Sequence, residues 1–213
     1  MLPSDPALLM MPTLSPGYAS VPAGMLANVV TCLEMREKPR PRAARPMEQP
    51  LTLTRMEEPD IAAYRALFRA VGQDWLWCSR LLMADDKLRD ILESPEVEVY
   101  TLSGTHRKLG LLELDFRQKG ECELAFFGLV PEAIGQGAGR FLMDEALRRA
   151  WAKPIERLWV HTCTLDHPAA VDFYRRSGFQ PYQFMVELQP DPRLTGHLPR
   201  EAAPHVPLAD FKA

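Results

Sequence analysis

The 213-residue chain lacks the features of secreted, membrane-spanning and nucleic-acid-binding proteins. Its four cysteines stand far apart and form no C-x-x-C pair, which is typical of reduced thiols in the cytoplasm rather than of a disulfide framework. The formal net charge is −3, so no basic field is present to attract nucleic acid. No Lys or Arg precedes Arg36, and five prolines interrupt the apolar stretch before it. We therefore expect neither a signal peptide nor a membrane span, and a cytoplasmic location.

The length suits one domain with a sizeable core, and proline-rich segments are expected to flank it. Residues 1–24 are expected to form a flexible extension, because the patterned chain begins near Met25, an alternative start. Residues 25–50 predict an additional strand followed by a linker rich in Pro and Arg. The main domain is predicted over residues 51–189. Residues 190–213 are expected to be a Pro-rich tail that either folds over the domain or stays loose.

Hydrophobic periodicity alternates between that of strands and that of helices, which predicts an α/β domain with a mainly antiparallel meander before the centre of the chain. Pro168 is expected in the first turn of the last helix. The predicted strands are 28–35, 51–56, 97–102, 109–116, 122–130, 157–163 and 182–188, and the predicted helices are 61–71, 80–92, 140–150 and 168–177.

Residues 121–150 read as an apolar strand, a glycine turn and an amphipathic helix, and the rest of the chain is organised around them. Gly135, Gly137 and Gly139 let the backbone turn sharply and approach a ligand closely, because glycine has no Cβ. The first N–H groups of a helix lack partners, so the turn is a candidate phosphate site, with a plain tight connection as the alternative. A dinucleotide fingerprint fails because Arg140 replaces its last glycine, and no P-loop Lys-Ser/Thr follows.

The glycine turn resembles the acetyl-coenzyme A binding motif of the GNAT superfamily of N-acetyltransferases, Q/R-x-x-G-x-G/A after an interior strand. Gly137 and Gly139 fill its glycine positions, and Ile134 stands where the family has Gln or Arg. The segment 170–179 matches a second family signature, A-x-x-x-Y-x-x-x-G-F. The resemblance covers roughly residues 51–188. It implies an α+β fold in which a mixed, mostly antiparallel sheet splays around the coenzyme, with helices on both faces.

The resemblance also implies a reaction: transfer of an acetyl group from acetyl-coenzyme A to an amine by direct attack in a ternary complex. Glu123 matches the catalytic Glu of some members, and a partly buried carboxylate there would have a raised pKa suited to a base. A structural Glu and a water relay are the alternatives. Tyr174 would protonate or stabilise the leaving thiolate, unless it is only a core aromatic. Backbone N–H groups near Phe127 would stabilise the oxyanion.

The coenzyme would be held mainly by backbone groups. Leu129 and Val130 would pair with the pantetheine arm, and His167 would replace the family's Asn near the coenzyme or cap the following helix. Trp75 and Trp77, between the first two helices, would shape the acceptor pocket or belong to the core. The pyrophosphate would lie on the turn formed by Gly135, Gln136, Gly137, Ala138, Gly139 and Arg140.

Several alternatives remain open at this point. A non-catalytic acyl-coenzyme A sensor would use the same glycine turn. Phe126 and Phe127 argue against a longer acyl chain, which would need small residues beyond the thioester. His161, Cys163 and His167 form an H-x-C-x-x-x-H pattern, but a fourth ligand is missing, so we expect no metal. We expect the acceptor to be a primary amine of a small molecule or peptide, although nothing in the sequence identifies it. Exposed strand edges would permit a homodimer.

Overall fold

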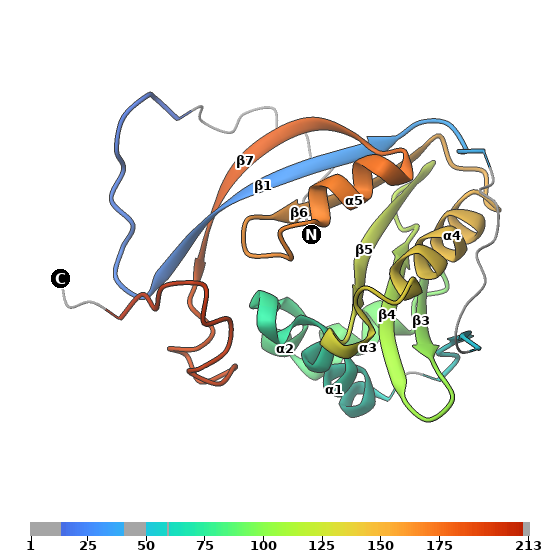
Figure 1. Cartoon of the computed structure of the whole chain (residues 1–213), viewed down its shortest axis with the longest axis horizontal. Coiled ribbons are helices and arrows are strands. Elements are labelled where there is room, and N and C mark those ends of the chain that lie inside the picture. Colours follow the sequence, from blue (N-terminus) through green and yellow to red (C-terminus); the bar gives the residue numbers. More distant parts are fainter. Residues whose placement is uncertain (1–13, 41–49, 59, 211–213) are drawn as a thin grey trace.

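The computed structural model of the chain describes residues 14–40, 50–58 and 60–210. The remaining parts of the predicted extension, linker and tail lie outside the described residues. Seven strands form one sheet in the order β2-β3-β4-β5-β6-β1-β7, and every neighbouring pair except β5 and β6 is antiparallel (Figure 1). The strands are β1 (Met25–Met35), β2 (Thr52–Arg55), β3 (Val97–Ser103), β4 (Lys108–Asp115), β5 (Glu121–Leu129), β6 (Arg157–Cys163) and β7 (Gln180–Pro190).

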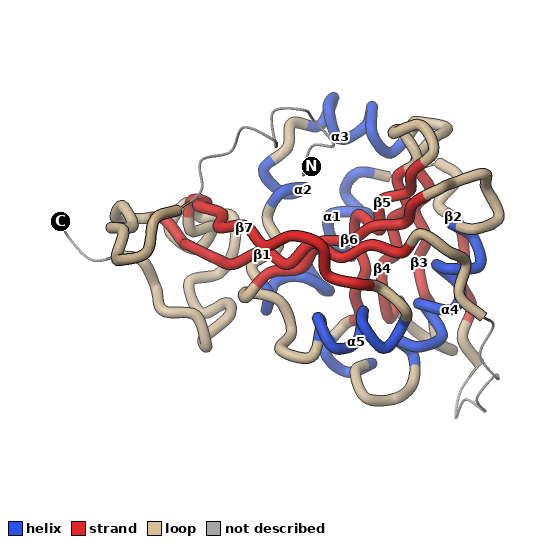
Figure 2. The backbone as a smooth tube through the Cα atoms, turned by 90° about the horizontal axis from the view of Figure 1, so that it is seen from above, coloured by secondary structure: helices blue, strands red, loops and turns tan. Residues whose placement is uncertain are grey.

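Five α-helices within the described residues cover the two faces of this sheet, with α1, α2 and α3 on one face and α4 and α5 on the other (Figure 2). The mixed, mostly antiparallel fold with helices on both faces is as predicted. No helix in the described part of the chain is long and apolar enough to cross a membrane. The helices are α1 (Ile61–Gly72), α2 (Ser79–Leu82), α3 (Asp85–Leu92), α4 (Ala138–Ala150) and α5 (Ala170–Ser177), and the short 3-10 turns are η2 (Gln73–Trp75) and η3 (Pro131–Ala133).

Cross-strand pairing identifies the residues that point to the side of the sheet covered by α1. We call this side of the sheet the α1 face. Glu113 of β4 accepts hydrogen bonds from α1 and α2, so it lies on this face. Asp115, two residues later, lies on it as well. Their partners on β5 are Phe126 and Glu123, which therefore also face α1 and α2. The predicted apolar stripe of α4 is buried on the opposite side of the sheet, as Leu142, Met143, Ala146, Leu147 and Ala150.

The single helix predicted over residues 80–92 is wrong, because the chain breaks into α2 and α3. Met83 and Ala84 have extended backbone, with ψ of 138° and 149°. The reason is a long-range contact: Arg65 of α1 donates to the carbonyl oxygen of Met83 and binds the Asp85 carboxylate. A smaller difference concerns α5, which begins at Ala170, so Pro168 precedes the helix instead of lying in its first turn.

β1 lies inside the sheet, between β6 and β7, and so belongs to the same sheet as the predicted main domain. Residues 191–210 fold back and form a second apolar cluster beside the start of β1. Arg193 is buried and bound to Asp191, and it also donates to the carbonyl oxygens of Val206 and Pro207. The cluster joins Leu26, Leu76 and Leu165 to Leu198, Ala202, Ala203 and Ala209.

Candidate active site

β5 and β6 lie side by side only at their beginnings. Three residue pairs join them, and the last is Glu123 with Trp159. β5 then continues to Leu129 without a partner on that side, and Figure 1 shows the two strands diverging. We call the region beyond this last pair, where β5 and β6 are no longer paired, the splay. It gives β5 a free edge in the middle of the sheet, where an extended ligand could bind as an added strand.

Beyond Glu123, the backbone N–H and C=O groups of successive β5 residues point alternately toward β4 and into the splay. Val130 donates its N–H to the carbonyl oxygen of Leu109, which defines the groups that point at β4. By the two-residue period, the N–H and C=O groups of Leu129 and Phe127 point the other way, into the splay. The carbonyl oxygen of Val130 accepts from Ala133. Val130 therefore has no free backbone group for the predicted pairing with pantetheine, whereas Leu129 and Phe127 do.

A bulge lies in the middle of β5. The register shifts where Glu113 is paired with Phe126 and the next β4 residue with Leu124, so Ala125 has no partner. A bulge bends a strand and increases its twist, which moves β5 away from β6. The bulge at Ala125 lies two residues before Phe127, the residue whose N–H is expected to stabilise the oxyanion. Its second effect is to turn Glu123 and Phe126 to the same face although they are three residues apart.

The glycine turn follows η3 and leads directly into α4. Gly135 and Gly137 both have φ of 83°, in the left-handed region that favours glycine. Gly137 is the N-cap of α4 and supplies no side-chain hydrogen bond, so the first helical N–H groups are not capped by a side chain. A Cβ built on Gly139 would meet Leu129 at 3.7 Å and Phe173 at 3.8 Å. The start of α4 therefore lies against the end of β5 and against α5.

The polar side chains of the glycine turn have partners of their own. The amide of Gln136 donates to the carbonyl oxygen of Glu132 at 2.6 Å, which turns it back along the loop. Nε of Arg140 lies 3.6 Å from a carboxylate oxygen of Asp144, one helical turn later. Ile134 is 40% exposed at the position where the family motif has Gln or Arg. Backbone N–H groups at the start of α4 are thus the main donors that this turn offers to a ligand.

Glu123 has the environment expected of a general base. Its side chain is only 12% exposed, and burial raises the pKa of its carboxyl to about 7, with Asp115 and Glu113 adding to the rise and Arg80 opposing it. Nε2 of His161 on β6 lies 3.8 Å from Oε1 of Glu123, across the end of the strand pairing. Burial lowers the pKa of His161, so the imidazole is neutral at physiological pH.

The acidic groups beside Glu123 are already paired. Asp115 accepts hydrogen bonds from Arg117, and Glu113 accepts from Tyr64 and Arg80 in a buried cluster. The guanidinium of Arg80 also lies 5.0 Å from the ring centre of Phe126. Sequence reasoning missed this cluster, although acids at alternate positions of an otherwise apolar strand were a visible signal. Glu123 is therefore the carboxylate of this group that remains available to a ligand.

Tyr174 is buried on α5 among aromatic rings. Its ring centre lies 6.2 Å from that of Phe127 and 5.8 Å from those of Phe173 and Phe179. Within the described residues, its hydroxyl makes no hydrogen bond to another side chain or backbone group. Burial raises the pKa of this phenol, so it stays protonated and acts as a hydrogen-bond donor.

Trp77 forms part of the core on the α1 face. Its ring centre lies 5.5 Å from that of Phe68 and 5.4 Å from that of Phe126. Its indole N–H donates to Asp166, whose other carboxylate oxygen accepts from Thr162. Trp77 thus ties the connection after α1 to the loop after β6, across the open end of the splay.

Trp75 lies nearer the surface, between two histidines. Its ring centre is 5.2 Å from that of His167 and 5.8 Å from that of His205 in the C-terminal segment. Nδ1 of His167 accepts a hydrogen bond from the N–H of Ala169, the residue before α5. His167 therefore contacts both the start of α5 and Trp75, the predicted wall of the acceptor pocket. Sequence reasoning gave no signal for His205.

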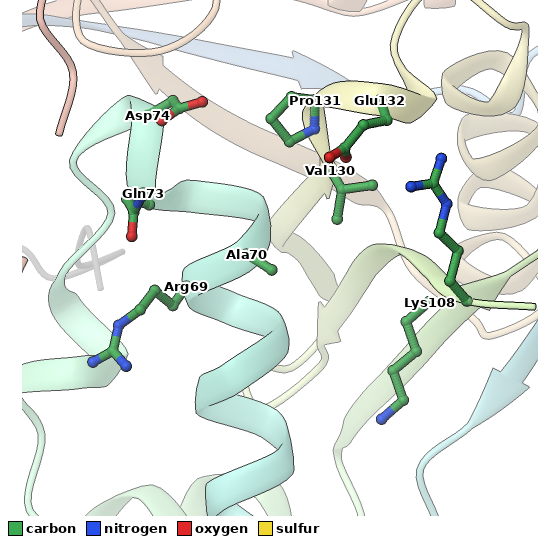
Figure 3. A pocket seen from close by; sticks show the side chains of 9 residues that line it. Arg69, Ala70, Gln73, Asp74, Lys108, Val130, Pro131 and Glu132 are labelled. Carbon is green, nitrogen blue, oxygen red and sulfur yellow. The ribbon is translucent and has the colours of Figure 1, made fainter.

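A cavity of about 400 Å³ lies between the end of α1, the β3–β4 hairpin and η3 (Figure 3). Arg69, Arg107 and Lys108 contribute positive charge to its wall, and Asp74 and Glu132 contribute negative charge. Val130 is the one predicted site residue that lines it. The cavity is thus distinct from the splay.

The four cysteines are free, and none has the environment of a nucleophile. Burial raises the pKa of all four thiols, to about 11 for Cys78 and about 12 for Cys163. A protonated thiol is a poor nucleophile and a poor metal ligand. Among the described residues, no group of three or more His, Cys, Asp or Glu side chains is placed to hold a metal ion.

A family model described as "Acetyltransferase (GNAT) family" matches residues 64–179, more than half of the chain. The chain belongs to the GNAT family. The match begins in α1 and ends at the residue after Gly178, so it contains β5, the glycine turn and α5. No curated protein matches this GNAT protein.

Solved structures of other GNAT proteins share the fold at low identity. A GCN5-related N-acetyltransferase from Sphaerobacter thermophilus is 15% identical with a TM-score of 0.57, over 76% of this chain and 51% of that one. The ribosomal-protein-S18-alanine N-acetyltransferase from Escherichia coli is 14% identical with a TM-score of 0.51, over 66% and 94%. An aminoglycoside acetyltransferase from an uncultured soil metagenomic sample is 18% identical with a TM-score of 0.50, over 60% and 87%. The chain thus spans about half the length of the Sphaerobacter protein.

Proposed function

We propose that this GNAT protein is an N-acetyltransferase that moves an acetyl group from acetyl-coenzyme A to a primary amine by direct attack in a ternary complex. The observation that carries the proposal is the free edge of β5. It begins at Glu123, presents the backbone groups of Phe127 and Leu129, and ends against the glycine turn. A thioester carrier with an amide-containing arm and a pyrophosphate matches these features in that order.

The glycine turn would hold the pyrophosphate. The N–H groups of Ala138 and Gly139 lie in the first turn of α4, where helical N–H groups lack intrahelical acceptors and the dipole favours anions. The left-handed backbone of Gly137 brings these groups to the surface without a Cβ in the way. The backbone of Leu129 would then pair with the pantetheine arm.

Glu123 would act as the base. An alkylammonium acceptor with a pKa of about 10.4 must lose a proton before it can attack. The carboxyl group of Glu123, with a pKa of about 7, is ionised in about half of the molecules at neutral pH, and this carboxylate form can accept the proton. The acceptor would approach over the α1 face, past Phe126 and Trp77, with Trp75 at the outer wall.

Phe127 and Tyr174 would stabilise the charges that develop as the C–N bond forms and the C–S bond breaks. The N–H of Phe127 points into the splay and would donate to the oxyanion. The hydroxyl of Tyr174 would donate to the departing thiolate. Because burial raises the pKa of Tyr174, a hydrogen bond to the thiolate is favoured over full proton transfer.

Two further features support this route over others. The cysteine thiols have raised pKa values, which favours direct attack over an acetyl-cysteine intermediate. The rings of Phe127 and Phe173 are stacked 5.6 Å apart, and these bulky side chains favour a short acyl group over a long one. Four free thiols also suit a reducing compartment, and we place the protein in the cytoplasm.

The acceptor screen is the direct test. The release of coenzyme A thiol would be followed with polyamines, aminoglycosides, amino acids and peptides with free N-termini. We expect acetyl-coenzyme A alone to raise the melting temperature, and one acceptor class to give turnover. No thermal shift at saturating acetyl-coenzyme A would contradict the proposal.

A non-catalytic acyl-coenzyme A sensor is the second candidate, because the glycine turn and the free edge would serve binding equally well. Glu123→Gln and Tyr174→Phe separate the two. An enzyme loses turnover in both variants and keeps its affinity for coenzyme A. A sensor binds the coenzyme and releases no thiol with any acceptor, in the wild type as in the variants.

A further inference from the structure

Four large apolar side chains lie exposed beside one another on β1 and β7. Val29 is 44% exposed, Phe184 is 68% exposed, and Val186 and Leu188 are each 51% exposed. Val29 is paired with Val186, and alternate residues of β7 share a face, so the four form one patch, here called the β7 strip. Figures 1 and 2 show β1 and β7 running past the end of α5. Contiguous exposed apolar patches mark interaction surfaces, whereas scattered apolar residues do not.

The backbone of the β7 strip is unpaired at its outer edge. β7 is the last strand of the sheet, and within the described chain no strand pairs with its outer side. Val29 directs its N–H and C=O to Thr164, beside β6, so it makes no backbone hydrogen bond to Val186. The N–H and C=O groups of Val186 therefore point outward, and by the two-residue period those of Phe184 and Leu188 do as well. The same three residues expose apolar side chains and unpaired backbone groups.

We propose that β7 pairs antiparallel with β7 of a second copy of this chain, about a two-fold axis at Val186. In this arrangement Val186 lies opposite its own copy, and Phe184 lies opposite Leu188 of the second copy. These are the residues whose backbone groups point outward, so each can form a hydrogen-bonded pair. Pro181 and Pro190 lack an N–H and limit the paired segment at its two ends.

The composition of the strand favours a second copy over a different partner. Glu187 is the one charged residue of β7, and it points to the opposite face, where Asn28 donates to its carboxylate. Two copies can therefore pair without bringing like charges together. The paired face also carries no charged residue that would favour a partner with a different sequence. Edge strands that remain unpaired usually carry a lysine, a central proline or a bulge; the register of β7 shifts at Tyr182, but the segment from Gln183 to Gln189, which includes the proposed axis, has none of these.

The β7 strip has the apolar character expected at the centre of such an interface. A stable interface covers about 800 Å² on each partner and has an apolar centre with a polar rim. The β7 strip would supply the centre, and the flanking side chains of Gln180 and Gln189 would supply part of the rim. The proposal does not depend on the enzymatic activity, and the result of the acceptor screen leaves it unchanged.

The test is the molar mass of the full chain in solution, measured by sedimentation velocity over a wide range of concentrations. We expect the wild type to have twice the monomer mass of 24.1 kDa. Val186→Lys places two like charges against each other at the axis, and should weaken the dimer at least tenfold. Leu82→Lys changes an apolar residue of α2 that is 45% exposed, and should leave the mass unchanged.

A second variant separates the loss of the dimer from misfolding. Val186→Pro removes an outward N–H and no hydrogen bond to β1, so the folded monomer should persist by circular dichroism while the dimer is lost. A wild-type mass of 24.1 kDa at every concentration overturns the proposal, including the case in which another segment of the chain covers the β7 strip. A Val186→Lys variant that stays dimeric overturns it too.

Discussion

Glu123 lies opposite Trp159 in the last residue pair that joins β5 to β6. The sheet is continuous up to this pair and divided beyond it, so Glu123 stands where the splay begins. Its side chain is largely buried and keeps 12% of its surface exposed. This position accounts for a carboxyl group whose pKa is raised to about 7 and which can still exchange its proton with a ligand.

The first prediction concerns the pH dependence of the reaction. A base must be deprotonated, so kcat/KM should rise with pH up to about 7 and then level off as Glu123 ionises. Glu123→Gln should lower kcat/KM by roughly 100-fold or more and remove this acid limb, because general bases contribute about 10²–10⁴-fold. Initial rates of thiol release across pH check this.

Glu121→Gln is the matched control for this experiment. Glu121 lies on the same strand two residues earlier, and its carboxylate is bound to Arg157 at 3.2 Å. The variant should keep the acid limb and most of the activity. If Glu123→Gln kept the limb instead, the base would have to be another group, such as a water molecule.

The second prediction concerns stability. The pKa of Glu123 is raised from 4.5 to about 7 on folding, so the folded protein binds this proton more tightly than the unfolded chain does. The wild type should therefore lose up to about 3 kcal/mol of this contribution as the pH rises from 4.5 through about 7. Glu123→Gln should be more stable than the wild type above this range and similar below it. Urea unfolding at several pH values measures the difference, and equal stability at all pH values would contradict it.

The fold was predictable where the sequence pattern of a short segment alone identifies a strand, turn or helix. The strand ending before Pro131, the glycine turn and the stripe of α4 each carry their own pattern, and all were predicted. The position of β1 between β6 and β7 was not, because sheet order depends on long-range pairing. The break at Met83 has a similar cause, since Arg65 imposes it from another helix.

The candidate site was predictable only where a motif named its residues. Glu123 and Tyr174 were named by resemblance, and the structure places them on β5 and α5 on either side of the splay. The neighbours that tune the pKa of Glu123 come from β4 and α2, which the sequence does not connect to it. His161 was considered only as a metal ligand. His205 lies in a segment without periodicity, so its contact with Trp75 depends on the folded tail.

The third prediction concerns the glycine turn. Gly137→Ala adds a Cβ to a residue with φ of 83°, which costs about 1–2 kcal/mol. The turn either keeps its conformation under strain or changes it. The affinity of this variant for coenzyme A should fall by about tenfold in calorimetric titrations. Gly139→Ala should stay within a few-fold of the wild type, because the new Cβ would make ordinary contacts with Leu129 and Phe173. Equal effects of the two variants would contradict the role of the left-handed residue.

The fourth prediction concerns the buried cluster of Tyr64, Arg80 and Glu113. Glu113→Gln leaves the buried guanidinium of Arg80 without its counter-ion, and should lower the free energy of unfolding by about 3–5 kcal/mol. Tyr64→Phe removes one hydrogen bond and should cost about 1–3 kcal/mol. Arg89→Ala, which breaks an exposed ion pair, is the control and should cost under about 1 kcal/mol. A small effect of Glu113→Gln in urea unfolding would show that the cluster does not carry this stability.

The fifth prediction concerns the C-terminal segment, which contacts the wall of the proposed acceptor site through His205 and Trp75. Arg193 holds this segment together, because its buried guanidinium binds Asp191 and the carbonyl oxygens of later residues. Arg193→Ala should release residues 194–210, which limited proteolysis and hydrogen exchange would detect as faster cleavage and exchange there.

The matched control is Arg200→Ala, in the same segment, because Arg200 forms an exposed ion pair with Asp210 and its loss should change neither measurement. The affinity for coenzyme A should be unchanged in both variants, since the glycine turn at the start of α4 makes no contact with this segment among those described. The Michaelis constant of any acceptor found in the screen should rise in Arg193→Ala alone, because the packing behind Trp75 would be lost. An unchanged acceptor constant together with a released tail would show that the segment stabilises the fold without shaping the acceptor site.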